Sequence, residues 1–340
     1  MEPDILLTVV IPAYNAQDYI DRAVTSVHGF DQVEVLIVDD GSTDKTAEIS
    51  DEWAARDPER IRVIHQENAG HGGAVNAGIA SARGRYLKIL DADDWLDRLA
   101  LKRALERLAL REEQGEALDL LVANYVYEKQ GKSHKAVIRY GNVMPRDRVV
   151  SWDEVKHCRY DQYLMMHALI LRTELVRECG LVLPTHTFYV DFIYSFVPVI
   201  AVRTFEYLDV DLYRYFIGRD DQSVNEQVMI SRVDQLLRVN AAMVDAIPHP
   251  DDVPPKLYRY LVHYLRINCV ICTVMLLRSG TEENAARKDE LWAQLEAKKP
   301  EAYRAVRRDL LGRLITLRSK PGRAVIMSGY HISQWVLGFN

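Results

Sequence analysis

The stretch LKILDADDW, Leu87 to Trp95, joins an apolar run to three carboxylates, Asp91, Asp93 and Asp94. The apolar residues predict a buried strand, which places the carboxylates at its carboxyl end. Ligands of open α/β sheets collect at that edge, where one or two Asp residues typically hold Mg²⁺ or Mn²⁺ against substrate phosphate. The stretch therefore predicts a metal-dependent reaction of a phosphorylated donor. Taken alone, it also fits the ordinary use of Asp in turns and helix caps.

The surrounding sequence predicts an α/β fold. Four apolar runs recur every 24 to 28 residues and are separated by helical patterns: 8–12, 33–40, 61–65 and 85–91. This alternation is typical of a mostly parallel sheet flanked by helices. The first run ends in IPAYN, without the GxGxxG turn of a dinucleotide-binding unit, which argues against NAD and FAD.

We expect an α/β domain over residues 1–230 and a helical C-terminal region over 231–340. A helical pattern at 97–113 and an apolar run at 119–128 extend the first domain, whose sheet then continues, in parallel or antiparallel. From about Ser231 the apolar residues follow a helical period. The proline-rich stretch IPHPDDVPP, 247–255, has the composition of a linker.

Composition bounds the class of protein. The chain has 340 residues, 48% of them hydrophobic, enough for one large domain or two. The sequence shows neither a basic, apolar leader nor an uninterrupted run of 18 apolar residues, so we expect a cytoplasmic protein. The four cysteines do not form a disulfide framework, and Cys269 and Cys272 are interpreted as structural. No nucleic-acid-binding module is recognisable.

Charge is concentrated near the C-terminus. Between Lys298 and Arg323 there are nine Lys and Arg against two acidic residues, although the whole chain has a net charge of −6. Residues 324–340 then contain Tyr330, Trp335 and Phe339 but no acidic residue, Lys or Arg. A basic stretch followed by an aromatic, apolar one favours peripheral contact, through 298–340, with the inner face of a membrane. The alternative is a terminal helix docked on its own domain or on a second copy in a homo-oligomer.

Polar loops follow all four predicted strands. Tyr14 and Asn15 follow the first, where an aromatic ring can stack on a base, and Asp39 and Asp40 end the second. The third leads into NAGHGGAVNAG, 68–78, whose four glycines allow backbone to approach a ligand closely at a helix start. His71 in this loop fits a ligand contact or a solvated side chain. Together the loops predict one crevice.

Four motifs in this order, VVIPAYN, VDDGSTD, NAGHGGAVNAG and LDADDW, resemble those of family 2 glycosyltransferases. The resemblance is strong over about residues 6–100 and looser over 150–225. It implies the GT-A nucleotide-sugar-binding fold, Mn²⁺ or Mg²⁺ as cofactor, and UDP as the most common nucleotide.

The resemblance also implies roles for individual residues. Pro12, Tyr14 and Asp40 would hold the base, Asp91 would contact ribose or metal, and Asp93 would bind the metal on the donor diphosphate. The predicted nucleotide-binding set is Pro12, Ala13, Tyr14, Asn15, Asp40, Asn68, Gly70, Asn76, Asp91 and Ala92.

Asp191 takes the place of the family's catalytic base. The segment THTFYVDFIYSF matches the family's acidic pair, but Val190 stands where the first acid, usually Glu, is expected. Apolar neighbours would raise the pKa of Asp191 and suit proton abstraction, while pairing with an arginine such as Arg203 is the alternative. In YFIGRDDQSV, 215–224, Arg219 and Ser223 are candidates to bind the diphosphate.

We therefore expect an inverting transferase that moves a sugar from a nucleotide sugar to an acceptor hydroxyl. A lipid-linked acceptor, used in making capsule, exopolysaccharide or wall polymer, would suit a membrane-facing tail. The segment Gln235 to Val239 lacks the Trp of the QxxRW signature, which argues against processive synthesis. The alternatives are a sugar-phosphate nucleotidyltransferase, whose GTR loop the chain lacks, and a noncatalytic nucleotide-sugar-binding protein. Trp95, Trp152 and His167 fit an acceptor surface or the core.

Overall fold

The chain forms two compact units. The computed structural model describes residues 5–129, 135–217, 226–317 and 319–327. The first unit comprises residues 1–158 and 164–219, and the second comprises 159–163 and 220–340. Because residues 159–163 belong to the second unit, the chain passes from one unit to the other at 158/159, 163/164 and 219/220.

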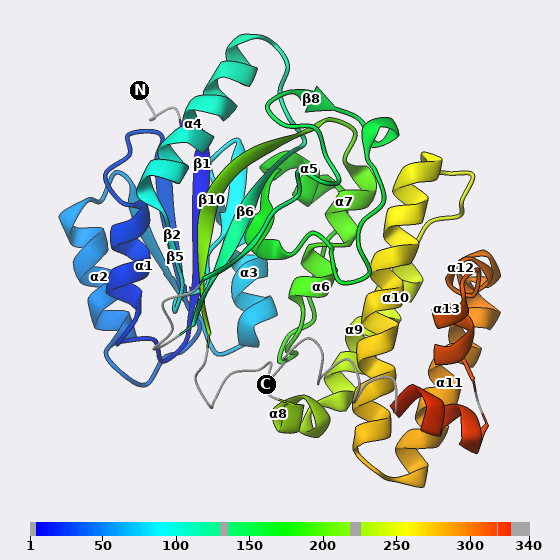
Figure 1. Cartoon of the computed structure of the whole chain (residues 1–340). Helices are drawn as coiled ribbons and strands as arrows, with labels where there is room; N and C mark the ends of the chain where they lie inside the picture. Colours follow the sequence, from blue (N-terminus) through cyan, green and yellow to red (C-terminus); the bar gives the residue numbers. More distant parts are fainter. Residues whose placement is uncertain (1–4, 130–134, 218–225, 318, 328–340) are drawn as a thin grey trace. The chain divides into compact units, whose positions relative to one another are not determined.

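A ten-stranded sheet forms the centre of the first unit (Figure 1). Its main strand order is β3-β2-β1-β4-β9-β6-β10-β5, with β7 beside β6 and β8 beside β10. The strands are β1 (Leu7–Ala13), β2 (Val33–Asp39), β3 (Ile61–His65), β4 (Tyr86–Ile89), β5 (Trp95–Leu96), β6 (Leu120–Lys129), β7 (Ala136–Ile138), β8 (Val149–Val150), β9 (Leu169–Arg172) and β10 (Phe205–Ile217).

The predicted α/β class is confirmed. The four predicted strands are β1 to β4, and β1 pairs in parallel with both β2 and β4. Beyond β4 the sheet is mixed, because β9 lies antiparallel between β4 and β6. The long strand β10 then pairs in parallel with β6 on one side and antiparallel with β5 on the other.

Helices cover both faces of this sheet (Figure 1). They are α1 (Ile20–Val27), α2 (Thr46–Arg56), α3 (Gly70–Ser81), α4 (Arg98–Glu113), α5 (Thr173–Glu178), α6 (Asp191–Tyr194) and α7 (Val197–Ala201). Every residue of β1 and β2 is buried, as expected for strands covered on both sides. Gly78 lets α3 approach β1, because a Cβ at this position would lie 2.2 Å from Val10 Cγ1.

The second unit is helical. It contains α8 (Glu226–Ser231), α9 (Val233–Ala246), α10 (Pro255–Arg278), α11 (Glu282–Lys298), α12 (Pro300–Val306) and α13 (Leu310–Ile315). The proline-rich loop 247–255 connects α9 to α10 inside this unit, so it is not an interdomain linker. Cys269 and Cys272 are buried free thiols on α10, in agreement with a structural role.

Helix α10 is long and apolar enough to cross a membrane, judged by length and composition alone. However, 67% of its apolar window is buried inside the structure, as in the core helix of a helical domain. Tyr163 of the short segment 159–163 stacks on Tyr264 of this helix at 4.8 Å between ring centroids. His263 and the backbone carbonyl of Gln162 are 2.9 Å apart, which ties the same segment to α10 a second time.

Candidate active site

The turn after β4 presents its three carboxylates differently. Asp91 and Asp93 are half-buried, whereas Asp94 is buried. One carboxylate oxygen of Asp94 accepts a hydrogen bond from the Phe216 backbone N–H at 2.7 Å, and the other accepts from the Tyr213 hydroxyl at 2.6 Å. Burial and the charges of Asp93 and Asp91 raise the pKa of Asp94 well above its usual range. Asp94 therefore ties the turn to β10, whereas Asp91 and Asp93 stay half-buried.

Asp91 lies between two histidines. His71 Nε2 of α3 is 2.9 Å from one Asp91 oxygen, and His167 Nε2 is 3.8 Å from the other. Burial opposes the charge of Asp91, but the two imidazoles outweigh it and hold the pKa of this carboxyl far below its usual range. The pKa of His71 is raised, because its bond to Asp91 and the charges of Asp191 and Asp93 outweigh its burial. Asp91 is thus a carboxylate at neutral pH.

His167 is held in place from behind by a buried lysine. The Lys88 ammonium donates to the backbone carbonyls of Met166, His167 and Leu169 at 3.2, 2.5 and 3.1 Å. Burial lowers the pKa of Lys88 to about 7, although Asp91 and Asp94 oppose that shift. These bonds fix the 3-10 turn η2 (Met166–Ala168) under the site.

Aromatic rings surround the His167 imidazole. It stacks on Tyr215 with 4.4 Å between centroids and meets Tyr213 edge-on at 4.5 Å. Only 4% of His167 is exposed, and neither ring nitrogen has a hydrogen-bond partner within the part of the chain that the structure describes. A buried imidazole with two unsatisfied nitrogens, one of them aimed at a carboxylate, is suited to bind a cation.

The donor set fits a divalent metal. Ligand atoms of Asp91, Asp94 and His167 all lie within 4.8 Å of one another. Both Asp94 oxygens accept hydrogen bonds, and the Asp91 oxygens contact His71 at 2.9 Å and the Tyr213 hydroxyl at 3.5 Å, so the His167 nitrogens are the unsatisfied ligand atoms of the three. Carboxylate oxygens suit Mg²⁺ and Mn²⁺, and an added imidazole shifts the preference toward the transition metal. Asp93, which the sequence predicts as a metal ligand together with Asp91, lies within electrostatic reach of His71 but is not one of these three residues.

Asp191 is the first residue of α6 and lies within electrostatic reach of His167, His71 and Asp91. Burial raises its pKa, and the two histidines reduce that shift only in part. Arg203, the alternative partner, bonds the backbone carbonyls of Ile200 and Val202. The structure thus brings Asp191, from a segment about a hundred residues later in the chain, beside the acidic turn.

The loop before Asp191 is under backbone strain and is pinned to α3. His186 and Tyr189 have φ angles of 46° and 66°, a region that bulky residues rarely adopt. The His186 backbone N–H donates to the Ala69 carbonyl at 2.8 Å. A Cβ at Gly70 would meet the His186 nitrogen at 2.8 Å, and one at Gly72 would meet the Pro184 carbonyl oxygen at 2.5 Å. These glycines therefore accommodate the chain's own loop.

Asn76, predicted to bind the nucleotide, bonds the same loop. Its side-chain nitrogen donates to the Leu183 carbonyl at 2.8 Å, and its oxygen accepts from the Leu183 N–H at 3.0 Å. The amide thus forms a two-bond clamp from α3 to residue 183. Nucleotide binding by Asn76 stays a prediction, and the alternative is a structural role in holding the loop at Leu183.

The other predicted nucleotide residues gather at the ends of β1 to β3. Buried Asp40 accepts from the Gln66 side chain at 2.6 Å and the Ala69 N–H at 2.8 Å, and its backbone carbonyl accepts from Asn68. Asn15, with φ of 49°, accepts from the Thr43 N–H at 2.8 Å. Pro12 and Ala13 are buried in β1, and Tyr14 is 54% exposed beside them. Ala92 is buried in the acidic turn after β4.

Several site features were not predicted or cannot be placed. The sequence left His71 and His167 undecided and did not single out Lys88, although a lysine inside an apolar strand signals a buried partner. Trp152 belongs to the core, because it is buried and donates to the Val202 carbonyl. Arg219 and Ser223, the predicted diphosphate ligands, lie outside the described residues.

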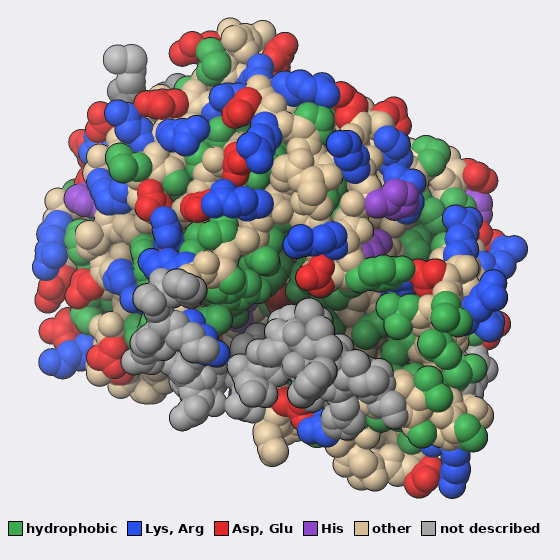
Figure 2. Space-filling view, in the orientation of Figure 1, with side chains coloured by type: hydrophobic (Ala, Val, Ile, Leu, Met, Phe, Trp, Pro, Cys, Tyr) green, Lys and Arg blue, Asp and Glu red, His purple; other side chains and the backbone are tan. Residues whose placement is uncertain are grey.

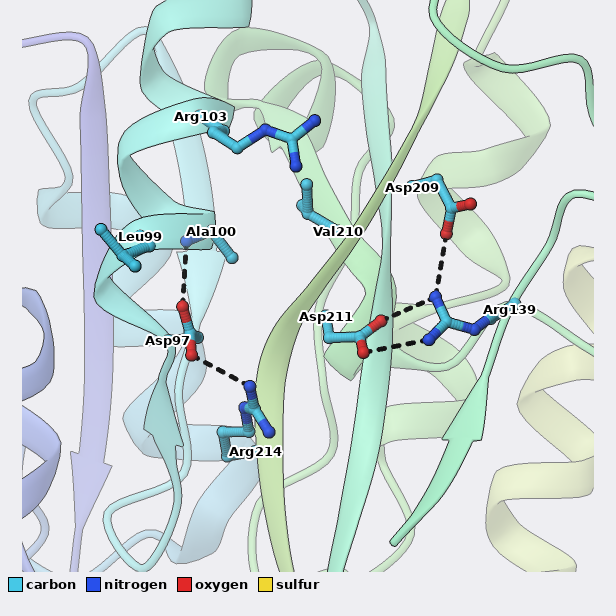
Figure 3. A pocket seen from close by; sticks show the side chains of 9 residues that line it. All are labelled: Asp97, Leu99, Ala100, Arg103, Arg139, Asp209, Val210, Asp211 and Arg214. Carbon is cyan, nitrogen blue, oxygen red and sulfur yellow. Dashed lines mark hydrogen bonds and ion pairs between the residues drawn. The ribbon is translucent and has the colours of Figure 1, made fainter.

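A separate pocket of about 300 Å³ lies between α4 and β10 (Figure 3). Arg139 bridges Asp209 and Asp211, each at 3.1 Å, and Arg214 bonds Asp97 at 2.9 Å. Side chains alternate along a strand, so Arg214 points to the opposite face of β10 from Tyr213 and Tyr215 of the acidic site. These charges pair with one another, and the pocket is not part of the acidic cluster.

Comparisons with known proteins agree with this geometry. The family described as "Glycosyl transferase family 2" matches residues 8–172. Glycosyltransferase GlyG of Streptococcus pneumoniae is 37% identical over 123 residues, covering 35% of this chain and 39% of GlyG. Chondroitin synthase of Escherichia coli is 43% identical over 103 residues, covering 30% of this chain and 15% of the synthase. The chain thus spans well under half the length of these curated relatives.

The fold is also found in a solved structure over nearly the whole chain. S. aureus TarS 1-349 in complex with UDP-GlcNAc has a TM-score of 0.71 and 18% identity, covering 97% of this chain and 92% of that one. Residues 8–172 thus match glycosyl transferase family 2, and the first unit has the GT-A fold.

Proposed function

We propose that the protein transfers a sugar from a nucleotide sugar, with UDP as the nucleotide, to an acceptor hydroxyl, and that the anomeric configuration inverts. The observation that carries this proposal is the meeting of Asp191 with the acidic turn and its two histidines, although these residues lie far apart in the sequence. The UDP-GlcNAc complex of TarS and the glycosyltransferase relatives support it.

A divalent metal, Mn²⁺ or Mg²⁺, would be held by Asp91 and Asp93, with His167 as an added ligand. When bound, such an ion supplies Lewis-acid stabilisation of the departing diphosphate. The chain's own residues position the donor: Pro12, Tyr14 and Asp40 line the proposed base site. Arg219 and Ser223 are proposed to contact the diphosphate.

Asp191 is proposed to be the general base. A carboxylate oxygen takes the proton of the acceptor hydroxyl, the hydroxyl oxygen bonds to the anomeric carbon, and the bond from that carbon to the diphosphate oxygen breaks. Attack from the face opposite the leaving group inverts the configuration. The raised pKa of Asp191 makes it a better proton acceptor than an exposed Asp.

The proposed setting is synthesis of a cell-surface polysaccharide on a lipid-linked acceptor, with 1–230 as catalytic domain and 231–340 as helical region. Residues near α13 suit peripheral contact with an anionic membrane. Leu310 and Leu311 are 72% and 48% exposed, and Arg307, Arg308 and Arg313 beside them have no carboxylate partner within the described residues. Figure 2 shows Lys and Arg side chains over this corner of the helical unit, next to hydrophobic ones.

Titration of UDP into the protein with and without Mn²⁺ tests the donor site. We expect UDP binding that Mn²⁺ strengthens in the native protein, and loss of that strengthening in Asp93→Ala. Asp147→Ala is the matched control, because Asp147 is an exposed carboxylate of the same unit that pairs with Arg107. If UDP, GDP, CDP and dTDP all fail to bind with Mn²⁺ present, the proposal is wrong.

Turnover of a UDP-sugar by Asp191→Asn tests the base. General-base catalysis contributes about 10²- to 10⁴-fold, so kcat should fall at least ~10²-fold while UDP affinity stays unchanged. In the native enzyme kcat should fall as the pH drops through the pKa of Asp191. Because that pKa is raised, the fall should begin above the range of an ordinary Asp, about pH 4. Normal turnover by Asp191→Asn would refute the assignment.

A further inference from the structure

The acidic turn is held by side chains from several elements. Asp91 is held by His71, and Asp94 by Tyr213 and the backbone of Phe216. The backbone at Asp93 is held instead by Arg22, from helix α1. Arg22 Nη2 donates to the Asp93 carbonyl oxygen at 2.6 Å.

Aromatic rings fix the direction of the Arg22 guanidinium. Its central carbon lies 4.1 Å from the centroid of the Trp95 ring and 4.9 Å from that of the Phe216 ring. Arginine stacks on aromatic faces through its planar, delocalised cation, and the stacked plane determines where its N–H groups point. Phe216 is also the residue whose backbone N–H bonds Asp94, so one residue of β10 contacts both the turn and the arginine.

A second residue of α1 holds the far end of the same segment. The Leu96 backbone N–H donates to the Ser26 hydroxyl at 3.1 Å. Arg22 and Ser26 are four residues apart, hence on one face of α1. Helix α1 therefore fixes the chain on both sides of Trp95, between the acidic turn and α4.

We propose that Arg22 is a positioning residue that sets the orientation of the Asp93 carboxylate toward a divalent cation. This inference rests on the proposed metal site at Asp91 and Asp93. A bond to the Asp93 carbonyl fixes the peptide plane that follows Asp93, and so limits the directions open to its side chain. Groups that hold a metal ligand in place typically change metal affinity 10- to 100-fold when removed.

The test measures metal affinity rather than turnover alone. Mn²⁺ is titrated calorimetrically into the full-length protein saturated with UDP, for the native chain, Arg22→Met and Arg22→Lys. Met keeps an apolar stem between the two rings but has no donor, whereas Lys keeps a charged donor without the planar stack. We expect Mn²⁺ affinity to fall roughly 10- to 100-fold in Arg22→Met and by less in Arg22→Lys, with metal-free UDP affinity unchanged.

Arg98→Met is the matched control. Arg98 lines the same hollow of about 360 Å³ and bonds the Thr25 and His28 carbonyls at the end of α1, and among the described residues no hydrogen bond or ion pair joins it to Asp93. Native Mn²⁺ affinity in Arg22→Met, or an equal loss in both Met variants, overturns the inference and leaves the proposed function standing. Absence of Mn²⁺-dependent UDP binding in the native protein overturns the proposed function itself. If Arg22→Met does not fold, Arg22→Lys decides between the same outcomes.

Discussion

Three aspartates within four residues differ because their neighbours differ. Asp91 has two histidines beside it and stays ionised, while Asp94 is buried against other carboxylates and its pKa rises. Both Asp94 oxygens accept hydrogen bonds, from the Tyr213 hydroxyl and the Phe216 N–H, so this carboxyl stabilises the fold. The sequence shows three aspartates without distinguishing them, and only the structure separates the two half-buried ones from the buried one.

Asn76 offers a test that separates two roles. Asn76→Ala removes two hydrogen bonds to Leu183, each contributing about 0.5–1.5 kcal/mol, so the free energy of unfolding should fall by about 1–3 kcal/mol. UDP affinity should change less than about threefold. Urea unfolding and UDP titration of the same variant provide both numbers. Weaker UDP binding with unchanged stability would show instead that Asn76 binds the nucleotide.

Much of the residue-level site was predictable, and the exceptions share a cause. Asp91, Asp93 and Asp191 carry a charge where the local pattern is apolar, which makes them visible in sequence. His167 carries no such signal, because a lone histidine in MMHALIL fits a core position equally well. Its role depends on Lys88, 79 residues earlier, and that pairing exists only in three dimensions.

At the scale of elements, α4 depends on the residue that precedes it. The N-cap Asp97 accepts from the Ala100 N–H at 3.0 Å and also bonds Arg214 of β10 (Figure 3). Asp97→Ala should lower the free energy of unfolding by about 1–3 kcal/mol, since it removes a cap of about 1 kcal/mol and one partner of a half-buried arginine.

A second substitution divides that loss between its causes. Asp97→Ser keeps a capping oxygen but removes the negative charge facing Arg214, so it should recover about the capping part of the loss. Urea unfolding of both variants is the measurement. Equal losses in the two would show that the ion pair alone matters.

Strands β1 to β4 were predictable because each is a short, mostly apolar run, and helices follow the first three directly. Strand β9 was not, since its four residues, LILR, lie between β4 and β6, which are more than thirty residues apart from each other and earlier in the chain. Strand β10 is broken by register shifts near Asp211, which interrupt its alternation. Long-range pairing of this kind has no local pattern.

At the scale of the whole molecule, the proposed membrane contact of the helical unit can be measured by flotation. Full-length protein should float with phosphatidylcholine vesicles that contain phosphatidylglycerol, and binding should weaken with salt. Arg307→Gln with Arg308→Gln should weaken binding roughly 10- to 30-fold, at about 1 kcal/mol per arginine.

Leu310→Ser with Leu311→Ser should also weaken vesicle binding, because the two side chains are exposed and available for burial in lipid. Leu99→Ser is the control, since Leu99 is 77% exposed on α4 of the first unit. If these leucine and arginine variants float like the native protein, the contact does not involve α13.

The path of residues 159–163 bears on how this protein arose and how it can be recombined. These five residues pack with α10 although the chain on either side of them belongs to the first unit. An end-to-end fusion of two genes would give each unit one continuous stretch of chain, whereas here each unit is built from two stretches. A chimaera that exchanges the helical unit between relatives must therefore replace 159–163 together with 220–340. A single junction near residue 220 would pack residues 159–163 of one protein against α10 of another.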